Sequence, residues 1–178
     1  TVRRMDSIHV VPHNPNWQLE YKRESMRLTR MMGANLLAIH HIGSTAIPNI
    51  VAKPIIDMLI VVQTIEQVEL HGAAMAAEGY LAFGENGIAG RRYFVKRGPG
   101  GERTHHVHVY ARGSAQIERH LVFRDYLLAH PAEARRYGEL KQSLAALHSN
   151  DRKAYQDGKD ALVHELMQAA QAGRDERA

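Results

Sequence analysis

The chain has 178 residues, a formal charge of +4 at neutral pH, 44% hydrophobic residues and no cysteine. This composition predicts one folded domain over residues 1–178, and it excludes disulfides and thiolate metal sites. The small positive charge favours anionic ligands, while the absence of a signal-peptide core and of a membrane-length apolar run predicts a cytoplasmic protein without membrane contact.

The first predicted elements are a helix and a strand. Asn14-Pro15 has the residues of a helix start, with Asn as the cap and Pro at the first helical position. Apolar side chains recur at helical spacing from there to Gly33, which predicts an amphipathic helix. Residues 36–42 then form an apolar run, which predicts the first strand of the core.

The stretch from residue 40 to residue 62 reads HHIGSTAIPNIVAKPIIDMLIVV and contains the best site candidate. Its end is β-branched and apolar, which predicts a buried strand that contains Asp57. An ionised carboxylate in such a strand is costly unless it is paired, hydrogen-bonded or bound to a metal. Gly43-Ser44-Thr45 ends the preceding strand, where a glycine and free N–H groups suit a phosphate. A simple turn glycine followed by a capping serine is the alternative.

The middle of the chain is predicted to complete a sheet. A surface helix is expected first, then a short strand, and then two alternating strands joined by the hairpin loop RGPGGE; the ranges are 64–78, 80–83, 91–97 and 104–111. In the last strand, His106 and His108 share one face and the valines share the other. We expect the valines to face a helical layer and the two histidines to lie on the open face of the sheet.

The C-terminal third is predicted to be helical. Ser114 caps a helix that ends at His130, a second helix runs from Pro131 to about residue 148, and Asp151 caps the last helix. Residues 1–13 and 173–178 are predicted to be flexible. The whole pattern indicates an α/β (α+β) domain with helices packed mainly on one side of the sheet.

The last predicted helix carries an unusual lysine. Lys159 lies one turn after Tyr155 on the stripe that should be apolar. A lysine at such a position costs stability unless its stem snorkels to solvent or its ammonium group meets an anion. Snorkelling is the common explanation, and contact with a phosphate is the alternative.

The segment HHIGSTAIPNIVAKPIID closely resembles the signature of the GrpB family, which is assigned to the nucleotidyltransferase superfamily of DNA polymerase beta. The later segments HHVHV (105–109), FRDYL (123–127) and DRKAYQDGK (151–159) agree with it. The resemblance implies a nucleotidyltransferase-like mixed sheet and a protein that binds a nucleoside triphosphate or another phosphorylated small molecule. It also implies a Gly-Ser turn after the first strand and paired carboxylates on the next.

The resemblance further implies a divalent metal, Mg²⁺ or Mn²⁺ with Zn²⁺ as an alternative. Asp57 would be a ligand, but Leu59 occupies the position of the second carboxylate, which puts two-metal catalysis in doubt. His106 and His108 lie where the superfamily has its last carboxylate, and imidazoles at i, i+2 on a strand can bind one metal together. The predicted catalytic and metal set is therefore Asp57, His106 and His108, with His41 as a further candidate.

Phosphate contacts are expected from the glycine turn and from cations in the family segments. The predicted contacts are Gly43, Ser44, Thr45, Lys53, Arg91, Arg92, Arg124, Arg152, Tyr155 and Lys159. A P-loop kinase is excluded because the chain lacks G-x-x-x-x-G-K-[ST]. A non-catalytic binding module and a metal-dependent phosphohydrolase are the alternative functions. Nucleic acid ranks below these because the basic residues are dispersed and aromatics are scarce.

Overall fold

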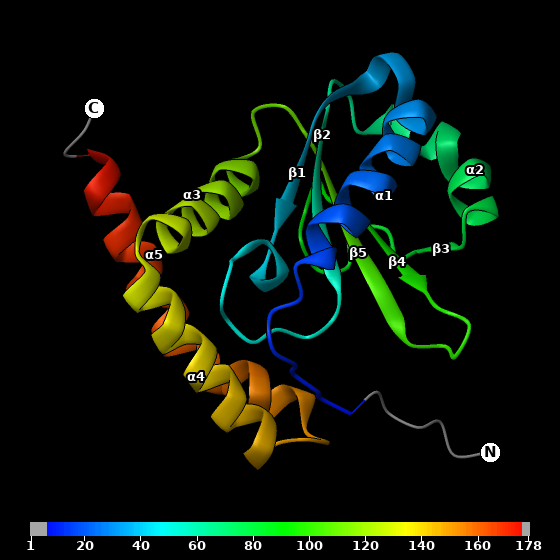
Figure 1. The fold of residues 1–178 in the computed structure, drawn as a ribbon. Helices are drawn as coiled ribbons and strands as arrows, with labels where there is room; N and C mark the ends of the chain where they lie inside the picture. Colours follow the sequence, from blue (N-terminus) through cyan, green and yellow to red (C-terminus); the bar gives the residue numbers. More distant parts are fainter. Residues whose placement is uncertain (1–6, 176–178) are drawn as a thin grey trace.

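The computed structural model describes residues 7–175 and has a five-stranded sheet at its centre (Figure 1). The strand order is β1-β2-β5-β4-β3; β2 and β5 are parallel and all other neighbours are antiparallel. The predicted mixed sheet is therefore confirmed. The strands are β1 (Leu36–Ile42), β2 (Ile56–Val62), β3 (Tyr80–Ala82), β4 (Arg92–Arg97) and β5 (Arg103–Ala111).

Five helices surround this sheet in two groups. The first group packs against one face of the sheet, and the second makes a separate layer that the connector from residue 43 to residue 55 joins to the sheet (Figure 1). The first group is α1 (Asn16–Met32) and α2 (Gly72–Ala77); the second is α3 (Ala115–Ala129), α4 (Pro131–Leu147) and α5 (Arg152–Asp175). The helical C-terminal third is thus confirmed.

The alternation of side chains along the two central strands creates two different faces. Met58 and Ile60 of β2 pack with Val107 and Val109 of β5 in the core under α1. Because successive strand residues point to opposite faces, Asp57, His106 and His108 lie on the other face. The prediction that the valines face the helical layer is therefore confirmed. The second face also has a small apolar cluster, which contacts α3.

The predicted helix caps are confirmed by local hydrogen bonds. Oδ1 of Asn14 accepts the N–H of Asn16, and Oγ of Ser114 accepts the N–H of Gln116. Asp151 caps α5 in the same way through the N–H of residue 154. The predicted helix over residues 64–78 is shorter in the structure: residues 66–71 form a 3₁₀ helix, and α2 begins at Gly72, a residue with low helix propensity.

Within the N-terminal segment that was predicted to be flexible, residues 8–11 form backbone contacts with the rest of the fold. The N–H of Ile8 donates to the carbonyl of Ser149 at 2.7 Å, and Val11 forms a two-residue bridge with Ala52. Residues 173–175 belong to α5, while residues 1–6 and 176–178 lie outside the described part of the chain. Within that described part, the structure has no helix that is long and apolar enough to cross a membrane.

Two glycines let the C-terminal helices approach each other and the connector closely. A Cβ atom on Gly158 of α5 would lie 2.5 Å from a methyl group of Leu144 in α4. A Cβ atom on Gly138 of α4 would lie 3.1 Å from Cβ of Ile50. This close packing brings the lysines of α4 and α5 to the turn that follows β1, where the candidate site lies.

Candidate functional site

The site is built on the turn that follows β1. Gly43 has a φ of 70°, in the left-handed region that favours glycine. A Cβ atom at this position would lie 2.6 Å from Oδ2 of Asp57, so the turn packs directly against the carboxylate of β2. Ser44 follows at the start of a 3₁₀ turn and is half-buried. The structure thus brings together three of the predicted site residues.

Asp57 meets both predicted histidines. In the parallel register of β2 and β5 it lies beside His106, and its Oδ1 is 3.2 Å from His106 Nδ1 and 3.8 Å from His108 Nε2. Burial alone would raise the pKa of Asp57, but the hydrogen bonds and charge of the imidazoles outweigh it and hold the pKa well below its usual range. Asp57 is therefore a stable carboxylate at neutral pH.

Arg91 determines which nitrogen of His108 carries the proton. Nη1 of Arg91 lies 3.4 Å from His108 Nδ1, and its guanidinium stacks over the Tyr93 ring at 4.8 Å. A guanidinium can only donate, so this contact assigns the accepting role to Nδ1 and leaves Nε2, which faces Asp57, as the ring nitrogen that donates. His106 Nε2 is buried and has no hydrogen-bond partner among the described residues. It remains available to a ligand group.

Two lysines contact one tyrosine ring near this carboxylate. Nζ of Lys53 is 4.5 Å, and Nζ of Lys159 is 4.7 Å, from the centre of the Tyr155 ring, which is 1% exposed. Burial and the nearby charges of Lys159 and Arg152 lower the pKa of Lys53 to about 8. Burial also lowers the pKa of Lys159. Neither lysine forms an ion pair with a carboxylate of residues 7–175.

A further lysine, Lys141 of α4, lies beneath the glycine turn. It is 3% exposed, and its Nζ donates to Oγ of Ser44 and to the carbonyl of Val51, both at 2.6 Å. Burial and the charge of Lys159 lower its pKa to about 7, although Asp57 acts in the opposite direction. At neutral pH, Lys141 is therefore divided between its protonated and neutral forms.

Lys141 was not among the predicted site residues, although the sequence contains the pattern that indicates it. Helices α4 and α5 each contain Tyr-x-x-x-Lys, as Tyr137–Lys141 and Tyr155–Lys159. Residues at i and i+4 share one helix face, and in both helices the ammonium group lies over the ring, at 4.8 Å and 4.7 Å from its centre. The argument that identified Lys159 as a lysine on a buried stripe applies equally to Lys141.

Three predicted phosphate contacts do not join this site. Arg92 shares a face of β4 with the core under α1 and forms an ion pair with Glu69, because side chains alternate along the strand. Arg124 of α3 donates to the carbonyl of His41 at 3.2 Å. Thr45 is buried, and its hydroxyl lies 2.9 Å from His41 Nε2. Their polar groups are engaged within the protein.

His41, predicted as a further metal ligand, lies on the opposite face of the sheet from Asp57. It is in register with Met58, and its Nδ1 is 3.1 Å from Oε1 of Gln18. Its ring stacks on Tyr21 with 4.7 Å between the centroids. Burial lowers its pKa to about 4, so the ring is neutral at pH 7. With both ring nitrogens engaged, His41 joins α1 to β1 and is not a ligand of this site.

The residues present do not fit the paired-carboxylate metal site that the resemblance implies. Leu59 is fully buried in an apolar cluster with Ile42 and Tyr110. Among the side chains of residues 7–175, no group of three or more His, Asp or Glu is arranged to hold a metal ion. Metal binding by Asp57 with His106 and His108 stays a prediction.

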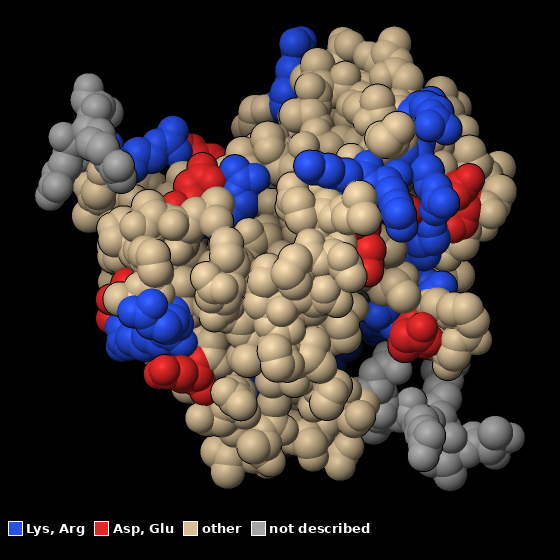
Figure 2. Space-filling view, in the orientation of Figure 1, with Lys and Arg blue, Asp and Glu red and all other residues tan. Residues whose placement is uncertain are grey.

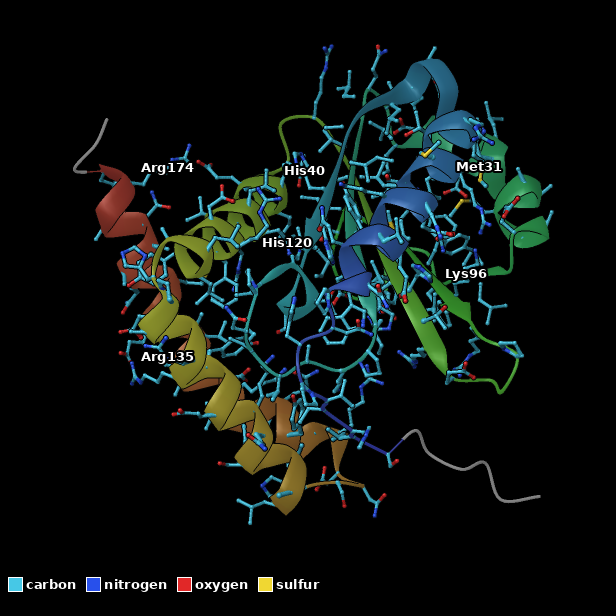
Figure 3. All side chains as sticks on the ribbon, in the orientation of Figure 1. Met31, His40, Lys96, His120, Arg135 and Arg174 are labelled. Carbon is cyan, nitrogen blue, oxygen red and sulfur yellow. The ribbon has the colours of Figure 1, made fainter. Side chains whose placement is uncertain are left out.

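On the side of α3 the site is neutral and aromatic. The His120 ring lies 5.4 Å from that of His108 and 6.1 Å from that of Tyr110, and burial lowers the pKa of His120 to about 4. Figure 3 shows His120 beside His40, between α3 and the sheet. The site therefore has a cationic half on the connector, α4 and α5, and a half of neutral rings near α3 that borders the guanidinium of Arg91. Sequence spacing gave no signal for His120, because α3 meets β5 only in the folded chain.

Other basic side chains are exposed and belong to the surface. Figure 2 shows Lys and Arg over α1 and α2 with acidic residues among them. On α1 these cations are exposed, and such charges contribute little to stability and are screened by salt. The α1 cations are Lys22, Arg23, Arg27 and Arg30. Burial distinguishes Lys53, Lys141 and Lys159 from this group.

The chain is an α+β domain with a polar site between two layers. The sheet, the glycine turn, and one carboxylate close to partly buried cations define this site. Comparison with known proteins identifies its family: a sequence profile described as "GrpB protein" matches residues 7–169. The chain belongs to the GrpB family.

Individual relatives agree with this assignment. UPF0157 protein YqkA of Bacillus subtilis is 51% identical over 88% of this chain, which spans 45% of the length of YqkA. UPF0157 protein PA4798 of Pseudomonas aeruginosa is 40% identical over 94% of this chain and 69% of its own length. The crystal structure of the conserved protein GrpB from Enterococcus faecalis superposes with a TM-score of 0.86 at 42% identity, covering 91% of this chain and 96% of that one.

Proposed function

We propose that the polar site beside Gly43 binds the phosphate groups of a phosphorylated small molecule, with a nucleoside triphosphate as the first candidate. The observation that carries this proposal is the pair of ammonium groups on the Tyr155 ring, neither of them paired with a carboxylate of the described residues. Half-buried cations without counterions are costly. A bound polyphosphate supplies the missing negative charge, and Lys53 and Lys159 supply its contacts.

The turn adds a second element of support. The backbone at Gly43 has no side chain that would block a ligand, and the Ser44 hydroxyl lies beside it. Glycine-rich turns with nearby lysines are a common way to hold phosphates. In this proposal, the neutral half of the site near His120 takes the organic part of the ligand, since uncharged aromatic rings suit a base or sugar.

The finer proposal is a nucleotidyltransferase-like reaction. It is supported by the GrpB family assignment and by the order of strand, Gly43-Ser44 turn and Asp57 strand along the chain. An acceptor hydroxyl attacks the α-phosphorus, pyrophosphate leaves, and the lysines stabilise the charge on the leaving group. Binding without transfer is the second candidate function, and the buried Leu59 in place of a second carboxylate favours it.

Thermal unfolding in the presence of each nucleoside triphosphate tests the binding proposal. A ligand that binds only the folded state at about 100 times its Kd stabilises that state by about 2.7 kcal/mol, which raises Tm. We expect this rise in the native chain and its loss in Lys159→Met. Lys153→Met is the matched control, because Lys153 lies on the same helix but is exposed and paired with Asp157. Equal responses in the two variants contradict the proposal.

Two additions to this experiment separate the finer readings. Repeating the titration with EDTA and with Mg²⁺, Mn²⁺ or Zn²⁺ tests the predicted metal, since a metal held by Asp57 produces a shift that Asp57→Asn removes. Release of pyrophosphate from a labelled triphosphate tests transfer. Binding without turnover across a panel of hydroxyl acceptors supports the binding module.

A further inference from the structure

A hydroxyl and an amine form one of the shortest polar contacts in the site. Oγ of Ser44 and Nζ of Lys141 are 2.6 Å apart. Lys141 is fixed in place because its Nζ also donates to the carbonyl of Val51 and lies over the Tyr137 ring. Ser44 is half-buried and follows the exposed Gly43, so the residue that contacts Lys141 is also partly open to solvent. The pair has the distance expected of a nucleophile and its base.

The surroundings of Lys141 favour the neutral amine. Lys159 of α5 and Lys53 of the connector contribute positive charge, Asp57 of β2 contributes negative charge, and Tyr137 contributes an uncharged ring. Together with burial, the two lysines outweigh the single carboxylate and lower the pKa of Lys141 to about 7. A neutral amine has a lone pair that can accept the proton of a hydroxyl, whereas an ammonium group can only donate.

We propose that Ser44 is a nucleophile and that Lys141 is its general base, acting on a phosphoanhydride held by Lys53 and Lys159. The choice of electrophile rests on the proposed function, but the reactivity of the pair does not. This proposal makes phosphoryl or nucleotidyl transfer proceed through a covalent serine intermediate rather than by direct attack of the acceptor.

The proposed step conserves atoms and electrons. Oγ of Ser44 forms a bond to phosphorus while the bond from phosphorus to the bridging oxygen breaks. The leaving phosphate keeps the electron pair of that bond, and the serine proton moves to Nζ of Lys141. A water or an acceptor hydroxyl then attacks the phosphoserine phosphorus, Ser44 regains a proton from Lys141, and the acceptor loses its own proton to solvent.

A fluorophosphonate probe tests the pair directly, because serine attack on its phosphorus expels fluoride without a nucleotide. We expect one label per chain, mapped to Ser44 by mass spectrometry and absent in Ser44→Ala. Ser143 is the internal reference, since it is an exposed serine of α4 whose hydroxyl donates to a backbone carbonyl. Labelling of Ser44 no faster than that of Ser143 overturns the proposal.

The role of Lys141 is tested by replacing the base while keeping its charge. Lys141→Arg retains a cation and donors but cannot accept a proton at neutral pH, so labelling should fall at least about 100-fold. Lys153→Arg is the matched control and should label at the native rate. An unchanged rate in a Lys141→Arg chain with a native melting transition overturns the proposal.

The pH profile of the native chain gives an independent reading that needs no variant. The labelling rate should rise as Lys141 loses its proton near pH 7 and then level off. A rate that keeps rising with hydroxide concentration contradicts a lysine base. Triphosphate binding is measured separately on Ser44→Ala. If that variant binds triphosphate but the native chain is not labelled, only the nucleophile–base pair is refuted. If the native chain is labelled but the variant does not bind triphosphate, only the proposed function is refuted.

Discussion

Two groups of buried charges in this protein are built in opposite ways. Under α1, Glu24 is 4% exposed; its Oε1 accepts from Lys96 Nζ and from the Tyr80 hydroxyl, both at 2.7 Å, and its Oε2 pairs with Arg27. Burial would raise the pKa of Glu24, but these partners outweigh it and lower the pKa. Every charge in this group therefore has its partner inside the chain.

The lysines near the glycine turn have no carboxylate ion-pair partner in the part of the chain that the structure describes. Lys53 and Lys159 lie over the Tyr155 ring, and Lys141 donates to neutral oxygens. The chain can neutralise a buried lysine with a carboxylate, as it does for Lys96. This difference supports the proposal that the second group binds an external anion, whereas the first group stabilises the fold.

The largest expected effect comes from breaking the group under α1. Glu24→Gln keeps the shape of the side chain but leaves Lys96 without a counterion, so we expect a loss of about 3 kcal/mol in the free energy of unfolding. Urea denaturation measures this loss. Glu20→Gln, an exposed position on the same helix, is the control and should change stability by less than about 0.5 kcal/mol. Equal effects of the two changes refute the structural role of Glu24.

Gly43→Ala should have the next largest effect. It forces a side chain into a positive-φ conformation and against Asp57, and we expect a loss of about 2 kcal/mol. Gly113→Ala is the matched control, because Gly113 also has a positive φ, of 85°, but has open space around the added Cβ. It should therefore lose only the stability that the strained backbone conformation costs. If both variants lose the same stability, the turn does not press on the carboxylate.

Lys159→Met sharpens the comparison because it should leave the fold intact. Methionine keeps most of the apolar stem and removes a charge that other lysines repel, so stability should stay the same or rise by up to about 1 kcal/mol. The same variant should lose triphosphate-dependent stabilisation. A loss of stability as large as that of Glu24→Gln would show that Lys159 is a structural residue.

The smallest expected effect is a dependence of anion affinity on pH. The pKa values of Lys141 and Lys53 are lowered to about 7 and about 8, and a bound anion favours their protonated forms. Sulfate, whose charge is constant in this range, should therefore bind several-fold more weakly at about pH 9 than at about pH 6. Calorimetric titration measures the change. An affinity independent of pH would contradict a role for these amines.

In the ligand-free chain, the same lysines should make stability change with pH in the opposite direction from anion affinity. Their folded-state pKa values lie below the unfolded value of 10.5, so the unfolded chain binds more protons between about pH 7 and that value. Their contribution to the free energy of unfolding should therefore increase as pH rises through this window. Urea denaturation at several pH values, compared with Lys141→Met, isolates it.

Much of the fold could be predicted because its signals are local. The caps at Asn14, Ser114 and Asp151 depend on hydrogen bonds within three residues, and β1 has the bounds that its apolar run predicts. The alternation along β5 also sufficed to separate the valines from His106 and the other site histidine. These features need no knowledge of tertiary packing.

The rest of the site depends on which elements meet. Alternation shows that Arg92 and its neighbours point to opposite faces, but which face meets Asp57 is decided by strand register. The face of β1 on which His41 lies likewise depends on strand register. Lys141 and His120 reach the site because α4 and α3 pack beside the connector and the sheet, and no short spacing in the sequence records that packing.

A crystal structure with a non-hydrolysable nucleoside triphosphate analogue tests the central claim most directly. We predict phosphate oxygens within about 3 Å of Nζ of Lys53 and Lys159, beside Gly43 and Ser44. An analogue ordered instead on the exposed cations of α1, with both of these lysines free of it, would contradict the account.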